Sequence, residues 1–322
     1  MRSDVRKAIA LAAAGATMVA LGRMVERHTI ARWASNPDAL AGRHARFPRG
    51  EAIRVGTDDG AELNTVTAGE GPRVILIHGL TSCIDDLGPI AELLIADGFS
   101  VTGVDQRGHG GSTVGVDGFG AHRHAADLAA VLSELDVNGA VLVGHSMGGV
   151  ASLTLAVENR ADISARVSGL VAIAAPTSLA PRREQLLAKL AALPIPALLT
   201  ARPGPSRIAA GWLAFGRDPS LFILDEALAS FNRCPEATRR EAMLGLTSYH
   251  LTDDLHRIEL PVLVITGGAD RLVSPANSGA VVRRVADARC IDYPGAGHAV
   301  TWERHQEIAV EIASFADAVQ SS

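Results

Sequence analysis

The sequence predicts an α/β fold, in which a mostly parallel sheet carries helices on both of its faces. Two observations support this prediction. From about residue 51, short runs of β-forming residues alternate with longer segments in which apolar residues recur at helical spacing. Several of these short runs are apolar throughout, which is typical of strands buried between two layers of helices. In such a sheet we expect functional side chains at the carboxyl ends of the strands.

The predicted elements follow one another in a regular order. Strands are expected over residues 52–57, 62–68, 73–77, 100–104, 140–143, 169–174, 261–266 and 289–293, and the turn sequence Asp58-Asp-Gly60 separates the first two. Helices are expected over residues 87–96, 122–135, 149–157, 276–285 and 301–318. Together these elements define a predicted core of residues 51–176 and 256–322.

The alternation is interrupted between about residues 177 and 255, a stretch much longer than a single crossover helix. It contains several short helical patterns, and we expect it to form a helical cap inserted between two strands. Five aromatic residues lie in it, although aromatic residues make up only 4% of the chain: Trp212, Phe215, Phe222, Phe231 and Tyr249. These side chains either line a pocket for a substrate or form a small core of the cap itself.

The first 50 residues form a predicted hydrophobic helix and a connector. Basic residues flank an uncharged, alanine-rich run of fifteen residues, 8–22. This length is short for a membrane-spanning helix, which needs about 20 residues, and it matches the apolar region of a signal peptide. A membrane anchor over residues 5–23, a helix packed on protein and a cleaved signal all stay open. We therefore expect a protein that is cytoplasmic or membrane-associated.

The composition argues against several classes of function. The net charge is −5 and no basic tract is present, so nucleic acid is not an expected partner. The three cysteines form neither a CxxC pair nor an even set, which disfavours a disulfide scaffold or a zinc site. His122 and His124 lie two positions apart on a predicted helix and face different directions. We expect neither a metal nor an organic cofactor.

One short segment carries the chemistry. Gly144-His-Ser-Met-Gly148 follows a predicted strand directly and precedes a predicted helix, which is the pattern of a nucleophile elbow. In such a turn the serine backbone is strained, and the two glycines let neighbouring backbone pass closely. The hydroxyl of Ser146 is then exposed above the sheet. A glycine-rich turn is also a routine connection, so the assignment depends on partners elsewhere.

A serine nucleophile needs a base, because its free hydroxyl is too weakly acidic to attack. His298 lies in the glycine-rich loop Pro294-Gly-Ala-Gly-His298, between the last predicted strand and the last predicted helix, and is the expected base. His145 is expected to pack under the elbow. His305 is expected on the surface of the last helix.

The base in turn needs a carboxylate that orients it and stabilises its protonated form. Asp270 follows the strand predicted over residues 261–266 and is the expected partner of His298; a turn or helix cap is its alternative role. Asp253 and Asp254 precede that strand, at the wrong end of the sheet.

The oxyanion that forms during attack needs two oriented N–H donors. The N–H of Met147, directly after the nucleophile, is one expected donor. The other is expected from Leu80 in the loop His78-Gly-Leu-Thr81, where Gly79 lets the backbone turn inward.

Together these segments resemble the α/β-hydrolase fold superfamily, and within it the capped serine esterase and lipase-like group. The resemblance covers residues 51–318 and rests on His78-Gly79, Asp105–Ser112, Gly144–Gly149, Gly268–Asp270 and Gly297-His298. It implies a bracing role for the loop after the fourth strand, with Arg107 and Asp105 pairing locally. Family members that act on epoxides or haloalkanes carry aspartate at the nucleophile position, whereas Ser146 favours acyl transfer.

The sequence therefore predicts a serine hydrolase that cleaves small apolar carboxylic esters through an acyl-enzyme. The same residues also serve cofactor-free peroxidases or perhydrolases, hydrolases of carbon–carbon bonds and thioesterases, and these alternatives stay open. A non-catalytic ligand-binding relative is the alternative of another class, and such a protein usually lacks a member of the triad.

Overall fold

The computed structural model describes residues 23–37, 40, 42–158, 160–178, 205–217, 219–247 and 249–321. Within these residues, eight strands form one sheet in the order β1-β2-β4-β3-β5-β6-β7-β8. β2 runs antiparallel to its neighbours β1 and β4, and the remaining pairs are parallel. The strands are β1 (Glu51–Gly56), β2 (Glu62–Ala68), β3 (Arg73–Ile77), β4 (Ser100–Val104), β5 (Ala140–His145), β6 (Val167–Ile173), β7 (Val262–Gly267) and β8 (Ala288–Tyr293). The predicted mostly parallel sheet is confirmed.

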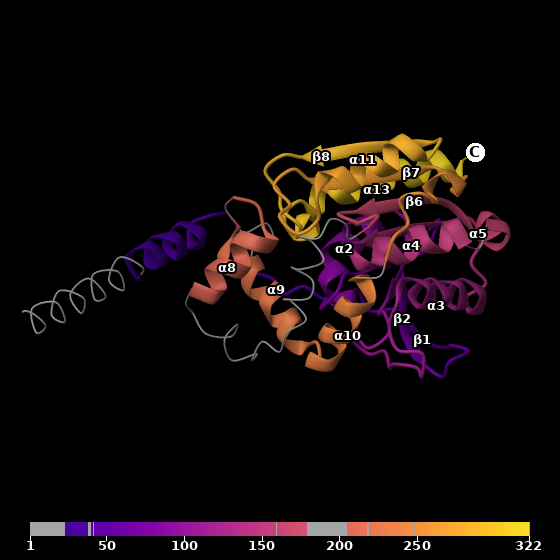
Figure 1. The fold of residues 1–322 in the computed structure, drawn as a ribbon, viewed down its shortest axis with the longest axis horizontal. Helices are drawn as coiled ribbons and strands as arrows, with labels where there is room; N and C mark the ends of the chain where they lie inside the picture. Colours follow the sequence, from indigo (N-terminus) through magenta and orange to yellow (C-terminus); the bar gives the residue numbers. More distant parts are fainter. Residues whose placement is uncertain are drawn as a thin grey trace, which may run out of the picture.

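Helices cover both faces of this sheet (Figure 1). One apolar cluster contains Ile75 and Ile77 of β3 together with residues of α3, α4 and α11, and the other contains Val74 and Leu76 together with residues of α2 and α13. Successive side chains of a strand point to opposite faces, so β3 contributes to both clusters. Full burial of each such side chain stabilises the fold by about 1.5–3 kcal/mol. These helices are α2 (Gly88–Ala96), α3 (Ala121–Glu134), α4 (Met147–Glu158), α11 (Pro275–Arg284) and α13 (His305–Gln320).

Two details of the helices differ from the prediction. A short helix that the sequence analysis missed, α5 (Arg160–Arg166), follows α4. The helix predicted over residues 301–318 is two helices, α12 (Val300–Glu303) and α13, because Arg304 leaves the helical conformation. The surface position predicted for His305 is wrong, since this residue is only 5% exposed. It lies at helical spacing from the buried Ile308 and Ile312, on the apolar stripe of α13.

Among the described residues, three α-helices lie between β6 and β7: α8 (Pro205–Ala214), α9 (Leu221–Arg233) and α10 (Glu236–Thr247). They are called the insertion below, and residues 179–204 of the predicted cap lie outside the described residues. Figure 1 shows the insertion, in salmon and orange, beside the helix of residues 23–34, in indigo. Trp33 of that helix belongs to an apolar cluster with Phe215, Leu224 and Trp302. The N-terminal connector therefore packs on the insertion as well as leading to the sheet.

The aromatic side chains of the insertion serve mainly as packing. Phe215 is buried in the cluster around Trp33, and Phe222 packs against it. Tyr249 belongs to one of the two clusters that flank the sheet. Trp212 is 58% exposed and lies under the guanidinium of Arg271. Of the two alternatives that the sequence left open, a core role therefore describes Phe215, Phe222 and Tyr249.

The predicted membrane-associated segment, residues 5–23, lies outside the described residues except for Arg23. Among the helices that the structure describes, none combines the length and the apolar character needed to cross a bilayer.

Candidate active site

Ser146 lies in a sharp turn between β5 and α4. Its φ is +50°, a left-handed conformation that non-glycine residues rarely adopt and that costs of order 1–3 kcal/mol. Two hydrogen bonds hold the turn: the Ser146 N–H donates to the carbonyl of Ile173 at 2.8 Å, and the Ser146 carbonyl accepts from the N–H of Val150 at 3.0 Å. The neighbouring strand and the first turn of α4 thus fix the strained residue.

The flanking glycines are required by close backbone contacts. A Cβ on Gly144 would lie 2.4 Å from the carbonyl carbon of Gly148. A Cβ on Gly148 would lie 2.4 Å from the carbonyl oxygen of Ile77 in β3. Neither position has room for a side chain, so the sequence pattern of the elbow follows directly from its geometry.

The structure brings the three residues of the predicted triad together. The Nε2 atom of His298 lies 3.0 Å from Ser146 Oγ, and its Nδ1 atom lies 2.8 Å from Asp270 Oδ2. Because a carboxylate only accepts, Nδ1 carries a proton and Nε2 can accept the proton of the serine hydroxyl. The side chain of Asp270 is 1% exposed and that of His298 is 14% exposed. This arrangement can deprotonate the serine.

Asp270 makes the contacts expected for both of the roles that the sequence left open. Its Oδ1 atom accepts the N–H groups of Leu272 and Val273 at 2.8 and 2.9 Å, which forms a turn, while Oδ2 faces His298. Burial acts to raise the pKa of Asp270, but the charge and hydrogen bond of His298 and the two backbone donors outweigh it. The net pKa is below the ordinary value, so the carboxylate stays ionised beside the base. The rival Asp253 pairs with His250 and Arg284.

His145 packs beneath the elbow and contacts the backbone of His298. Its Nε2 atom lies 3.0 Å from the carbonyl oxygen of His298, and the two rings lie 5.2 Å apart. Burial, with a smaller contribution from the charge of His298, lowers the pKa of His145 to about 3. His145 is therefore neutral near pH 7 and donates this hydrogen bond through Nε2–H.

The two predicted oxyanion donors flank the nucleophile. Among the described residues, neither the N–H of Leu80 nor that of Met147 donates a hydrogen bond. Met147 begins α4, where the helix dipole favours negative charge. A Cβ on Gly79 would lie 3.2 Å from Ser146 Cβ, so the loop of Leu80 closely approaches the elbow. Both N–H groups are therefore available to a substrate oxygen.

His78 orients one of these donors, a role that the sequence analysis missed. Its Nδ1–H donates to the carbonyl of Gly79 at 2.7 Å, and its Nε2 accepts the N–H of Gln106 at 3.0 Å. The C=O and N–H of a trans peptide point in opposite directions, so this bond turns the Leu80 N–H away from His78. Burial lowers the pKa of His78 to about 4, and the ring stays neutral. The only sequence signal was the His-Gly pair itself.

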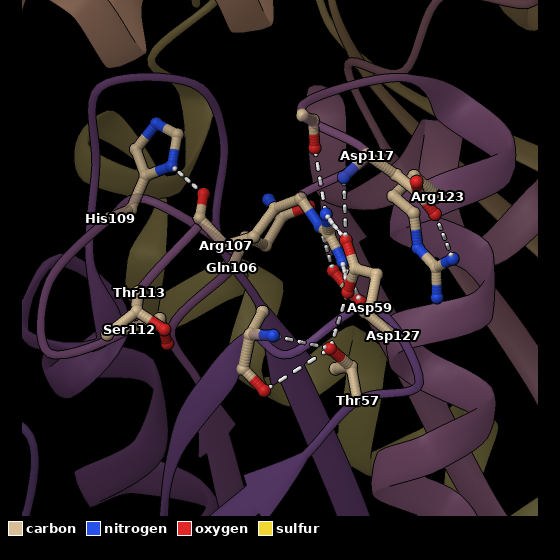
Figure 2. Close-up of polar contacts among 12 residues, drawn as sticks. Thr57, Asp59, Gln106, Arg107, His109, Ser112, Thr113, Asp117, Arg123 and Asp127 are labelled. Atoms are coloured by element: carbon tan, nitrogen blue, oxygen red, sulfur yellow. Dashed lines mark hydrogen bonds and ion pairs between the residues drawn. The ribbon is translucent and has the colours of Figure 1, made fainter. Parts of the chain in front are cut away.

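The predicted pairing of Arg107 with Asp105 is wrong. The fully buried guanidinium of Arg107 instead contacts Asp59, at 2.9 Å, and Asp127, at 2.6 Å (Figure 2). Asp105 accepts the N–H of Ile84, the N–H of Gly111 and the side-chain amide of Asn64. The loop is braced as expected, in part by Gly111 within the loop and otherwise by residues far away in the sequence.

Comparison with known proteins gives a consistent result. Residues 71–305 match the family model described as serine aminopeptidase, S33. A non-heme haloperoxidase from Rhodococcus erythropolis is 29% identical over 81% of this chain and 98% of its own length. An esterase from Exiguobacterium antarcticum is similar in structure, with a TM-score of 0.74, 18% identity and coverage of 83% of this chain and 100% of that chain. A bacterial membrane phospholipase A aligns over 100% of both chains, with a TM-score of 0.69 and 20% identity.

Proposed function

Because the chain belongs to the serine aminopeptidase S33 family of α/β hydrolases, we propose that it cleaves carboxylic esters through an acyl-enzyme on Ser146. The observation that carries this proposal is the continuous hydrogen-bonded chain from Ser146 Oγ through His298 to Asp270. A strained serine, a base and a buried carboxylate in this geometry perform acyl transfer in unrelated folds as well.

In the first half of the proposed reaction, Ser146 Oγ attacks the ester carbonyl while His298 Nε2 takes its proton. The negative charge that develops on the carbonyl oxygen is held by the N–H groups of Leu80 and Met147. Loss of one such donor costs about 3–4 kcal/mol of transition-state stabilisation. Asp270 stabilises the imidazolium and keeps Nε2 directed at the serine.

The tetrahedral intermediate then collapses. His298 donates its proton to the leaving alcohol oxygen as the carbon–oxygen bond breaks. A water molecule next attacks the acyl-enzyme and gives a proton to His298, which returns it to Ser146 Oγ as the acid leaves. The triad ends in its starting state, and the cycle uses no group beyond the chain and water.

A second activity, perhydrolysis, is favoured by a relative from Acinetobacter calcoaceticus described as a bifunctional esterase/perhydrolase, which is 26% identical over 81% of this chain and 98% of its own length. In this reaction hydrogen peroxide replaces water in the attack on the acyl-enzyme and releases a peracid. Adding peroxide to the ester assay and measuring peracetate separates the two activities.

We further propose that the insertion acts as a cap that selects small apolar acyl esters, and that residues 5–23 attach the protein to a membrane. The uncharged run between basic residues supports the second proposal, as does the full-length alignment with a membrane phospholipase A. Fractionation of cells that express the protein with and without residues 1–30 tests it: if the full-length protein stays in the soluble fraction, the attachment is refuted.

Labelling with a fluorophosphonate probe tests the nucleophile. We expect the wild type and Ser133→Ala, a change on the exposed surface of α3, to label equally, and Ser146→Ala not to label. Equal labelling of Ser146→Ala would overturn the assignment. Wild-type protein that labels but turns over no p-nitrophenyl ester of any chain length would overturn esterase activity and keep the nucleophile.

A further inference from the structure

Two carboxylates lie where the insertion contacts the loops that carry the proposed catalytic groups. Asp86 lies six positions after Leu80, and Glu303 lies five positions after His298. Each accepts one hydrogen bond from its catalytic loop and one from the insertion. Neither carboxylate touches the triad, and neither has a role in the reaction described above.

Asp86 joins α9 to the loop of the oxyanion donor. Its Oδ2 atom accepts the hydroxyl of Ser82 and the hydroxyl of Ser230, both at 2.6 Å. Ser230 belongs to α9. Ser82 belongs to the loop of Leu80: its N–H donates to the carbonyl of Gly79, and this carbonyl is part of the same peptide group as the Leu80 N–H. A displacement of α9 therefore removes one of the two hydroxyl groups that bind the Asp86 carboxylate, to which Ser82 of this loop is also bound.

The hydrogen bond between Ser230 and Asp86 matters because the carboxylate is buried. Asp86 is 6% exposed, and its nearest guanidinium, that of Arg233, lies 3.8 Å away on a side chain that is 57% exposed. A buried carboxylate with so weak an ion pair depends on its hydroxyl donors for solvation. Arg233 belongs to the same helix as Ser230, so when α9 withdraws the Asp86 carboxylate loses both contacts and must rearrange toward water, and Ser82 moves with it.

Glu303 joins the end of α8 to the loop of the base. Its Oε1 atom accepts the N–H of Gly216 at 2.8 Å, and its Oε2 atom accepts the N–H of Gly297, directly before His298, at 2.6 Å. The Ala299 N–H, on the other side of His298, donates to the carbonyl of Ala214 in α8 at 2.7 Å. The backbone on both sides of the base is thus fastened to the insertion.

The packing at this contact is too close to allow an independent shift. A Cβ on Gly297 would lie 2.3 Å from the carbonyl carbon of Phe215, and one on Gly216 would lie 2.0 Å from the carbonyl oxygen of Gly295. Backbone of the insertion and backbone of the histidine loop therefore touch directly.

We propose that Asp86 and Glu303 are positioning residues through which the insertion, when seated on the sheet, sets the position of the oxyanion donor and of the base. The inference rests on the proposed function for the identity of the catalytic groups. An unseated insertion leaves Ser146 in place, because β5, β6 and α4 hold it, but it releases Leu80 and His298. Seating of the insertion is then a condition for catalysis and not only for substrate binding.

Full-length Ser230→Ala breaks the insertion side of the Asp86 contact and leaves the carboxylate. With p-nitrophenyl acetate, an ester too small to need an acyl pocket, we expect kcat to fall about tenfold and KM to change little, since a misplaced donor costs less than a lost one. The matched control is Ser220→Ala, which removes the N-terminal cap of α9 and leaves the contact intact. Asp86→Asn, whose amide oxygen can still accept both hydroxyl groups, should keep most of the activity that Asp86→Leu loses.

Full-length Glu303→Gln tests the second contact, because an amide offers one acceptor and one donor to two N–H groups. We expect labelling of Ser146 by the fluorophosphonate to slow about tenfold, as expected for a displaced base. Glu307→Gln, an exposed position one turn along α13, should label at the wild-type rate.

Amide hydrogen exchange measures the coupling without any activity. Ser230→Ala should speed exchange in residues 79–84, and Glu303→Gln should speed it in residues 295–299. Unchanged exchange in both loops would overturn the proposal. A rise in KM for long-chain esters with unchanged kcat on the acetate would also overturn it, because the insertion would then only bind substrate. If the wild type hydrolyses no ester, the proposed function fails, while the exchange experiment still decides the coupling.

Discussion

The Nε2–H of His145 donates a hydrogen bond to the carbonyl oxygen of His298, at a distance of 3.0 Å. The residue before the proposed nucleophile thereby holds the backbone of the proposed base. Ser146 and His298 are 152 positions apart in the chain, and this bond joins the strained turn of one to the glycine-rich loop of the other. The low pKa of His145, about 3, keeps the ring neutral, so it does not compete with His298 for a proton.

Replacement of His145 by leucine should lower kcat for p-nitrophenyl acetate about tenfold, because the base loses one of its supports. His145→Gln carries an N–H donor of similar reach and should recover part of the loss. Both variants should still label with the fluorophosphonate probe, although more slowly. Equal activity of His145→Leu and the wild type would show that the bond has no role in positioning.

Asp270→Asn should lower kcat by about four orders of magnitude, because the amide favours the wrong tautomer of His298 and cannot stabilise the imidazolium. Steady-state kinetics at pH 8 measure this effect. Asp254→Asn, a half-exposed position before β7, is the control and should keep wild-type activity. A loss of less than tenfold in Asp270→Asn would mean that the carboxylate serves the turn at Leu272 and Val273 alone.

Arg107→Met should destabilise the protein by about 3–5 kcal/mol at pH 7, because it leaves the carboxylates of Asp59 and Asp127 buried without a cation (Figure 2). Urea unfolding measures this loss. Arg43→Met, whose ion pair with Glu92 is largely exposed, should cost about 1 kcal/mol or less.

The stability of Arg107→Met should depend on pH because of the same two contacts. The hydrogen bonds of Arg107 hold the pKa of Asp59 below its usual range, against the effect of burial. A carboxylate with a lowered pKa in the folded state adds stability above its unfolded pKa, and this stability is lost as the pH falls through the folded pKa. Without Arg107, burial raises the pKa values of Asp59 and Asp127. The stability of Arg107→Met should therefore increase as the pH falls from about 7 to about 5. A constant difference from the wild type over this range would contradict the account.

The ionisation of Asp86 should affect the stability of the wild type in the direction opposite to that of Asp59. Burial raises the pKa of this carboxyl to about 6, although the hydroxyl groups of Ser230 and Ser82 and the charge of Arg233 lower it in part. The folded state then binds the proton more tightly than the unfolded state, so this group contributes most stability at low pH and loses it as the pH rises from about 4 to 6. The Tm of Asp86→Asn relative to the wild type should therefore be higher at pH 7.5 than at pH 4.5. Asp97→Asn, at an exposed site after α2, should show no such trend.

Local features of the sequence were sufficient for most of the sheet. The apolar runs at residues 73–77 and 140–143 predicted buried strands, since a strand covered on both faces needs no polar side. The prediction of burial failed for a polar residue that lies at a buried position. His305 is polar and lies on the apolar stripe of α13, and no local signal distinguishes it from a surface histidine.

Contacts between distant segments were beyond the sequence for a physical reason. Arg107 is separated by 48 positions from Asp59 and by 20 from Asp127, and Asp105, two positions away, offered an equally plausible carboxylate. Which carboxylates face the guanidinium depends on how α3, which carries Asp127, and the turn between β1 and β2, which carries Asp59, pack around it. The contacts of Asp86 with Ser230 and of Glu303 with Gly216 were unpredictable for the same reason.

The sequence by itself determined the elbow, because a left-handed serine between two positions without room for a Cβ requires Gly144, Ser146 and Gly148 in that spacing. It also placed Asp270 and His298 after strands, where parallel connectivity brings loop ends to one edge of the sheet. The tertiary structure alone decided the distances between these groups and the contacts of the insertion with their loops. Those depend on side chains that meet across the whole chain, and a hydrogen bond is made or lost within a few tenths of an ångström.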